Sequence, residues 1–306
     1  MCAYFDRIIH RKLANHNPMP KKDSKPLSSS PPHLRSIALH PPPERLAGRF
    51  PFEIPIIRAL LEHPHQPLEL AKPVTIFVGE NGSGKSTLIE ALACAAELPV
   101  VGSEDGSRDQ SLAHVRPLAD CIRLTWNRRS RRGFFLRAED FFGYARRMAR
   151  IRQELEQDLR TVDREYADRP EAIDYARMPY QSQLAGIRQR YGEGLDHASH
   201  GEAFLRLFQS RFVPGGLYLL DEPEAPLSPV RQLALLATIH DMVGQDAQFV
   251  IATHSPILMA SPGASLLSFD EDCIHPVQYA ELEHVNLTRD FLNNPEAYLR
   301  QLIVKD

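Results

Sequence analysis

Short apolar runs alternate along this chain with longer segments of helical periodicity. Three runs are rich in β-branched, aromatic or aliphatic residues and predict buried strands, namely Val74–Val78, Leu217–Leu220 and Gln248–Ala252. Helical patterns follow the first run at Ser86–Leu98 and separate the other two at Val230–Val243. Strands that are apolar throughout and alternate with helices predict an α/β fold, in which a mainly parallel sheet is flanked by helices.

The middle of the chain carries a different pattern, which predicts a helical arm over residues 144–191. Apolar residues recur there at steps of three and four on an otherwise charged helix, at Met148, Ile151, Leu155, Leu159, Val162 and Tyr166. Pro170 and Pro179 interrupt the pattern, and Gln181–Tyr191 is expected to return antiparallel. We therefore expect a short arm of at most about six turns, inserted into the main domain.

The first 49 residues differ from the rest in composition. Pro, Ser, His and Lys dominate residues 15–49, which contain too little apolar surface to offset the entropy lost when the backbone is ordered. This composition predicts a disordered N-terminal tail over residues 1–49. One folded domain is expected over residues 50–306.

Overall composition is that of an ordinary globular protein, with 43% hydrophobic and 25% charged residues and a formal net charge of −3. The four cysteines, Cys2, Cys94, Cys121 and Cys273, stand far apart without CxxC spacing. This spacing excludes a dense disulfide framework or a zinc knuckle and favours a reducing compartment. No apolar run approaches the roughly 20 residues needed to cross a bilayer. We therefore expect a cytoplasmic protein without a membrane span.

The segment after the strand Val74–Val78 fits the pattern GxxxxGK[ST] in full. It comprises Gly79, Glu80, Asn81, Gly82, Ser83, Gly84, Lys85, Ser86 and Thr87. Glycines let the backbone curl so that several N–H groups point inward at phosphate oxygens, and the dipole of the following helix adds to the attraction. We expect Lys85 to reach the β- and γ-phosphates of ATP and Ser86 to coordinate Mg²⁺ through its hydroxyl.

Polar residues also follow the other two predicted strands. Asp221 and Glu222 end the run Leu217–Leu220, and in P-loop proteins such a strand is expected beside the P-loop strand. Asp221 is predicted to hold Mg²⁺, and Glu222 to orient and polarise the attacking water. His254 comes directly after its strand and is predicted to contact the γ-phosphate. The structural alternatives are a solvated acidic strand end and a core histidine, and the intact P-loop argues against both.

With these residues in place, the chain resembles the ABC-type ATPases, and more narrowly the compact, stand-alone bacterial AAA/ABC-like ATPases related to SMC-type heads. The resemblance is carried by VGENGSGKST, DEPE and ATHSP and runs from about residue 50 to residue 260. It implies a P-loop NTPase fold of the ABC type, with ATP and Mg²⁺ as cofactors. It also implies a head-to-head homodimer that ATP holds together, and it leaves a further protein partner open.

Two more site residues follow from this resemblance. Ser199-His200-Gly201-Glu202 occupies the place of the family's LSGGQ-like signature, which implies that Ser199 and Gly201 bind the γ-phosphate held by the other subunit. Taken alone, this segment is a helix N-cap with a capping-box acid before the predicted helix Gly201–Phe212. Glu139 stands near the position of the family's metal-sensing glutamine and is a candidate Mg²⁺ ligand; the alternative is an acid at a helix N-terminus.

A basic segment offers a second kind of function. Cys121–Trp126 and Gly133–Arg137 predict two strands joined by a tight turn that carries Arg128, Arg129, Arg131 and Arg132. Such a cluster is suited to the phosphate backbone of nucleic acid, and the predicted arm begins with further arginines. The alternative is a solvated arginine-rich face that pairs with neighbouring acids.

The leading hypothesis is Mg²⁺-dependent ATP hydrolysis by an ATP-switched dimer, with Glu222, His254 and Lys85 as catalytic residues. The main alternative is a nucleic-acid-binding module gated by nucleotide, and a small-molecule kinase is less favoured because kinases rarely combine these motifs in this order. Phe50 and Phe52 precede the P-loop strand. We expect both to pack in the core rather than to stack on adenine.

Overall fold

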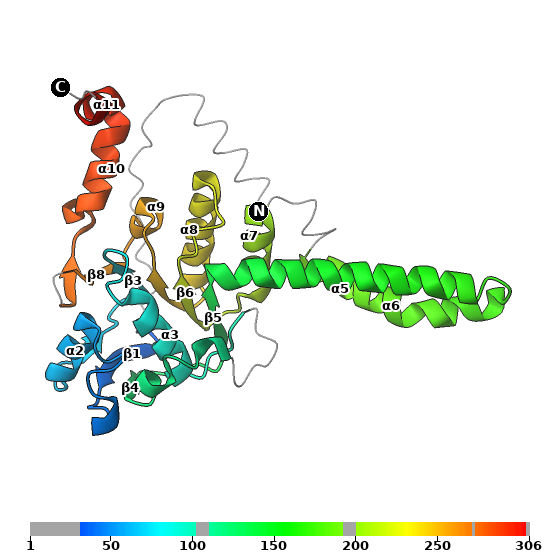
Figure 1. Ribbon diagram of the computed structural model, residues 1–306, viewed down its shortest axis with the longest axis horizontal. Helices are drawn as coiled ribbons and strands as arrows, with labels where there is room; N and C mark the ends of the chain where they lie inside the picture. The colour runs from blue at the N-terminus through cyan, green and yellow to red at the C-terminus, as the bar shows by residue number, and fades with distance from the viewer. Residues whose placement is uncertain (1–30, 102–109, 192–199, 271–272, 304–306) are drawn as a thin grey trace.

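The computed structural model describes residues 31–101, 110–191, 200–270 and 273–303. Its main body is a six-stranded sheet with helices on both faces, and a smaller three-stranded sheet lies beside it. A pair of long helices projects from one side of this body (Figure 1). Most of the expected N-terminal tail, residues 1–30, lies outside the described residues.

The large sheet is mainly parallel, as the sequence predicts. Its strands, in spatial order, are β5 (Gly133–Arg137), β6 (Leu217–Asp221), β7 (Gln248–Ala252), β3 (Val74–Val78), β8 (Ser265–Ser268) and β9 (His275–Val277). Only β9 runs antiparallel to its neighbour. The expectation that β6 lies beside the P-loop strand β3 is wrong, because β7 lies between them. The residues after all three strands still reach the same edge, since the three strands are parallel.

The small sheet corrects two predictions. Its antiparallel strands are β2 (Leu68–Glu69), β1 (Leu34–Leu39) and β4 (Ile122–Trp126). Strand β1 lies inside the segment expected to be a disordered tail, and its side chains Leu34, Ile37 and Leu39 are buried. The folded part therefore begins well before residue 50. Strands β4 and β5 are not a hairpin, because β4 pairs with β1 whereas β5 pairs with β6 in the other sheet.

Helices cover both faces of the large sheet. The P-loop helix α3 (Lys85–Ala95) packs on one face together with the small sheet, and α7 (His200–Arg211) and α8 (Pro229–Val243) pack on the other. The remaining helices are α2 (Pro55–Glu62), α4 (Arg116–Ala119), α9 (Pro256–Met259), α10 (Glu283–Asn293) and α11 (Pro295–Ile303), with short 3₁₀ turns η1 (Glu44–Leu46), η2 (Gln110–Leu112) and η3 (Tyr279–Glu281).

Alternation along the strands decides which side chains reach which face. In β6, Leu217 and Leu219 join the core on the α3 face, whereas Tyr218 and Leu220 join the core on the α7 and α8 face. The next residue, Asp221, therefore points to the α3 face, towards the P-loop helix.

The arm consists of α5 (Ala138–Glu165) and α6 (Pro170–Tyr191), which lie side by side (Figure 1). Helix α5 has 28 residues and so spans about 42 Å, which is longer than expected because the helix begins directly after β5. Pro179 lies inside α6 and does not interrupt it. Leu155 and Val162 of the predicted apolar stripe are buried, as is Leu184 on α6. Within the described residues, no helix is both long and apolar enough to span a bilayer.

The side chain of Gln248 connects the two sheets through hydrogen bonds. Gln248, at the start of β7, is 1% exposed, and its amide nitrogen donates to the Leu34 carbonyl over 2.8 Å. Its amide oxygen accepts a hydrogen bond from the Leu34 backbone N–H over 2.7 Å. Gln248 thus satisfies both backbone groups of a buried residue at the start of β1.

Replacing Gln248 by leucine should lower the free energy of unfolding by about 2–4 kcal/mol, because two buried backbone groups lose their partners. Gln245→Leu is the matched control, since Gln245 is exposed and its side chain makes one long hydrogen bond of 3.4 Å; we expect a change below about 0.5 kcal/mol. Urea denaturation measures both values. Equal losses in the two variants would contradict a fastening role for Gln248.

Candidate functional site

The P-loop adopts backbone conformations that require glycine. Gly82 and Gly84 have φ values of +83° and +96°, which side chains with a Cβ rarely adopt. A Cβ at Gly84 would also lie 2.9 Å from side-chain carbons of Ile54 and Ile56. At Gly82, by contrast, a Cβ would meet no atom within 4 Å, so this part of the loop borders open space. The loop therefore curls around a space that its own side chains leave empty.

The P-loop lysine is held by the loop itself. Nζ of Lys85 donates to the carbonyls of Gly79 and Glu80 over 2.8 and 2.7 Å and to Oγ of Ser83 over 3.2 Å. Burial lowers the pKa of Lys85, and the negative charge of Asp270 opposes this shift. The ammonium group is thus largely desolvated and lies within the loop that would surround a phosphate.

Asp221 and Ser86 are brought together as the sequence predicts. Ser86 donates its hydroxyl hydrogen to Oδ1 of Asp221 over 3.0 Å. The carboxyl group is only 3% exposed, and burial raises its pKa to about 7, although the hydrogen bond from Ser86 opposes the shift. A buried carboxylate beside a hydroxyl is a donor set of hard oxygens, which suits Mg²⁺. Within the described residues no cluster of three His, Cys, Asp or Glu side chains forms a metal site, so a magnesium ion here would also need water or phosphate oxygens.

Glu222 and His254 face each other across the edge of the sheet. Glu222 has a φ of +48°, an uncommon value for a residue with a side chain. The backbone changes direction between a buried and an exposed residue. Asp221 is buried, whereas the Glu222 side chain is 50% exposed. Oε1 of Glu222 lies 3.9 Å from Nε2 of His254. Burial, and then the charge of Lys85, lower the pKa of His254, which favours the neutral form of the imidazole.

Two further carboxylates shape the site, and the sequence analysis missed both. Oε1 of Glu224 accepts the backbone N–H of His254 over 2.7 Å and so fixes the position of that residue. Asp270 accepts the backbone N–H of Glu80 over 3.0 Å and the hydroxyl of Ser268 over 3.0 Å, which anchors the start of the P-loop. The available signals were the last acid of DEPE and an acid placed just after the apolar run that forms β8.

The P-loop helix is also joined to strand β5. Oε1 of Glu90 lies 2.5 Å from Nη2 of Arg137, and its Oε2 lies 2.9 Å from Nε2 of His114. Ser86 and Glu90 are one turn apart on α3, and their partners Asp221 and Arg137 lie opposite each other in the register of β5 and β6. Two side-chain contacts therefore connect one face of α3 to the ends of the neighbouring strands β6 and β5.

A cavity of about 280 Å³ lies at the carboxyl edge of the sheet, where many of the predicted residues meet. It is lined by Phe50, Ile54, Asn81, Gly82, Gly84, Lys85, Ser86, Thr87, Glu222 and His254. Phe52 is buried in the core, as expected. The same expectation is wrong for Phe50, which is 51% exposed and contributes its ring to the cavity.

Some predicted site residues that the structure describes do not line this cavity, namely Gly79, Glu80, Ser83, Asp221, Glu139 and Gly201. Glu139 is exposed on α5, and Arg137 is the residue of that segment that reaches the site, through its contact with Glu90. Ser199 lies outside the described residues. Gly201 is buried near the start of α7, where a Cβ would lie 2.8 Å from the Pro226 carbonyl. Its predicted contact with the nucleotide of another subunit stays a prediction.

The mainly parallel sheet, the P-loop and the Ser86–Asp221 pair together define a P-loop fold of the ABC type. Residues 57–171 match the model of the family described as AAA domain. No curated protein matches the chain.

Several solved structures are similar to the chain in fold. The Smc head domain from Pyrococcus furiosus, with an extended coiled coil and bound to the C-terminal domain of ScpA, is 12% identical at a TM-score of 0.40, covering 87% of this chain and 100% of that one. A putative metal-chelate type ABC transporter in an inward-facing conformation is 16% identical at a TM-score of 0.37, covering 71% and 77%. A nucleotide-free ATP-binding cassette from an ABC transporter is 14% identical at a TM-score of 0.36, covering 76% and 90%. All three likenesses are distant.

Because the pKa of Asp221 is raised, we expect the stability of the metal-free protein to depend on pH. In the unfolded chain Asp221 loses its proton near its ordinary pKa of 3.8, whereas in the folded protein it keeps the proton up to a pH of about 7. Asp221 therefore lowers the stability of the folded protein as the pH rises from about 4 to about 7. Asp221→Asn should therefore be more stable than the wild type at pH 8.5, by up to about 4 kcal/mol, and the gain should be much smaller at pH 5.

Denaturation in EDTA at both pH values measures this difference. Added Mg²⁺ should stabilise the wild type and not Asp221→Asn, because the cation would compensate the buried charge. An equal difference between the two proteins at pH 5 and pH 8.5 would contradict the interpretation of Asp221 as a buried, uncompensated acid.

Proposed function

We propose that the protein hydrolyses ATP to ADP and phosphate in a reaction that depends on Mg²⁺. The observation that carries this proposal is the convergence of the P-loop, Glu222 and His254 on one cavity, with the Ser86–Asp221 pair directly behind it. Each of these groups has a distinct place in phosphoryl transfer. No observation in the described residues favours a kinase, whose second substrate would need a site of its own.

The loop residues bind and orient the phosphates. Backbone N–H groups of the P-loop and the ammonium group of Lys85 neutralise the phosphate oxygens, and Lys85 exchanges its bonds to the loop carbonyls for bonds to phosphate. Ser86 and Asp221 would hold Mg²⁺, which neutralises charge on the transferring phosphoryl group when bound. These contacts fix the γ-phosphate in line with an attacking water.

Glu222 supplies the base. Its half-exposed carboxylate accepts a hydrogen bond from the attacking water and takes the proton as the water oxygen bonds to the γ-phosphorus and the bond to the bridging oxygen breaks. The neutral His254 can donate from Nε2 to a γ-phosphate oxygen or to Glu222, which keeps the carboxylate oriented. Glu224 positions His254 through its backbone N–H.

A second copy of the chain completes the site in this proposal. The resemblance to ABC-type heads supports a homodimer in which Ser199 and Gly201 of each chain act on the nucleotide bound by the other. Groups supplied in trans at phosphoryl-transfer sites are worth about 10³–10⁵ in rate, so a single chain should be nearly inactive. The cysteines among the described residues, Cys94, Cys121 and Cys273, are all free, which supports the cytoplasm as the compartment.

The activity is tested by measuring ATP hydrolysis against protein concentration with Glu222→Gln as the matched control. We expect a specific activity that rises with concentration in the wild type and falls at least about 100-fold in the variant, because the base is lost and the shape is kept. The variant should still bind ATP. A rate independent of concentration would contradict the dimer, and equal rates in both proteins would contradict the role of Glu222.

Phe50 is proposed to stack on the adenine ring, since its ring is exposed and borders the cavity. In the Glu222→Gln background, Phe50→Ala should weaken ATP binding by about 5- to 100-fold, the range of one base–aromatic stacking contact. Phe50→Tyr should retain the affinity. Titration with a fluorescent ATP analogue measures these constants, and inorganic triphosphate, which has no base, should bind all three proteins alike. An alanine variant with unchanged ATP affinity would exclude stacking.

A further inference from the structure

A second cavity, of about 620 Å³, lies at the opposite edge of the large sheet from the nucleotide site. The segments that line it come directly before β5, β6 and β7, whereas the nucleotide cavity lies where strands end. Its wall is formed largely by the basic loop, which we define as residues 127–132 and which includes Arg128, Arg129, Arg131 and Arg132. The proposed ATPase mechanism uses none of these residues.

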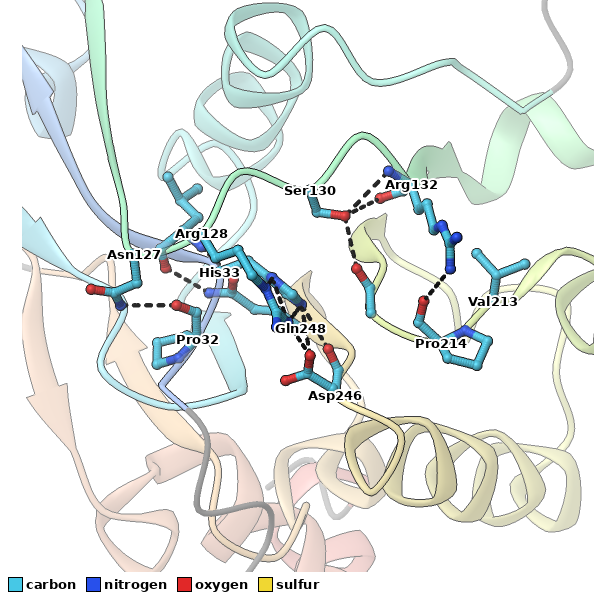
Figure 2. A network of polar contacts seen from close by, with 12 residues as sticks. Pro32, His33, Asn127, Arg128, Ser130, Arg132, Val213, Pro214, Asp246 and Gln248 are labelled. Carbon is cyan, nitrogen blue, oxygen red and sulfur yellow. Dashed lines mark hydrogen bonds and ion pairs between the residues drawn. The ribbon is translucent and has the colours of Figure 1, made fainter.

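Hydrogen bonds hold the basic loop in a fixed shape (Figure 2). At its start, the side chain of Asn127 donates to the Pro32 carbonyl over 2.9 Å. In its middle, the hydroxyl of Ser130 donates to the Gly215 carbonyl over 2.7 Å. At its end, the Arg132 carbonyl accepts the Leu217 backbone N–H over 2.9 Å. A loop ordered in this way loses little entropy when it binds a ligand.

Two of the four arginines help to anchor the loop. Arg128 forms an ion pair with Asp246 and contacts the ring of His33, and Figure 2 shows these side chains gathered at one point. Arg132 donates from Nη1 to the Pro214 carbonyl over 3.4 Å. These arginines connect the loop to the turns that precede β6 and β7, so their guanidinium groups are partly used within the protein.

The other two arginines are available to a ligand. Arg129 lies 3.1 Å from Glu97, but the two side chains are 62% and 79% exposed, and an ion pair of this kind contributes little to stability. Arg131 is exposed, and no contact within the described residues joins it to an acid. A phosphate can therefore replace Glu97 at Arg129, and at Arg131 it competes with no acid of the described residues.

We propose that the basic loop binds the phosphate backbone of nucleic acid, with Arg129 and Arg131 as the contacting residues. The open, exposed position of both side chains suits a long polyanion that lies along the surface better than an enclosed small anion. The nearby Phe134 and Phe135 are buried, and no Phe, Tyr or Trp among the described residues lines the cavity, so the cavity offers bases no large exposed ring to stack on. Recognition through phosphate alone predicts binding without sequence preference.

The arginines of the arm are weaker candidates. Arg150 and Arg152 pair with Glu154 and Glu156 one turn along α5, as the structural alternative predicts. The charge of this surface is therefore partly compensated, and it does not compete with the basic loop as an explanation.

The test is the binding of the full chain, without nucleotide, to a short labelled DNA duplex, followed by fluorescence anisotropy at several salt concentrations. Each phosphate contact contributes about −0.9 to the slope of log K against log salt. Arg129→Gln with Arg131→Gln should therefore reduce the magnitude of the slope by about 2 and lower the affinity at low salt. Thermal melting should be unchanged, since both side chains are exposed.

The matched control is Arg45→Gln with Arg300→Gln, which removes the same charge from two exposed arginines outside the basic loop. It should leave the slope unchanged. Equal slopes in the loop variant and the wild type would overturn the proposal, as would an equal fall in slope in the control.

A second measurement uses inorganic triphosphate. If the loop variant loses triphosphate binding and its duplex binding does not change, the loop binds small phosphates instead. Normal ATP hydrolysis in the loop variant would show that the two sites are separate.

Discussion

The attachment of the P-loop helix to the ends of two neighbouring strands is the constraint on which the site depends. Ser86 and Glu90, one turn apart on α3, contact Asp221 at the end of β6 and Arg137 at the end of β5. These strand ends lie opposite each other in register, so the two contacts together fix the direction and the rotation of α3. Lys85 begins this helix, and its position relative to Asp221 follows from the same contacts.

Local patterns along the chain predicted most of what a short segment decides by itself. The P-loop strand, the strand before Asp221 and the strand before His254 are confirmed because each is apolar throughout and ends at a turn. Pairing between distant segments was not predicted. Nothing local shows that β7 separates β3 from β6, or that β1, in a segment rich in proline, pairs with β4 about 90 residues later in the chain.

The residues of the candidate site fall into the same two groups, those that a local sequence pattern reveals and those that it does not. Residues whose side chains are proposed to act on phosphate or metal occur in motifs of fixed spacing, and these could be found. Glu224 and Asp270 act through the backbone N–H groups of other residues, His254 and Glu80, and such contacts leave no pattern in a sequence. Phe50 was expected in the core because it is large and apolar, and only the packed structure shows that its ring remains exposed at the rim of the cavity.

Strands β5, β6 and β7 connect the two edges of the molecule. Each has five residues and so spans about 17 Å, with the basic loop and its supporting turns before the strands and the nucleotide cavity after β6 and β7. A ligand at one edge changes the other only if the strands have two arrangements that it distinguishes. The strands carry fully buried Tyr218 and Phe249 rings that stack on each other, and such a close-packed core resists small shifts. If the strands keep this one arrangement, the proposed polyanion site and the proposed nucleotide site act independently of each other.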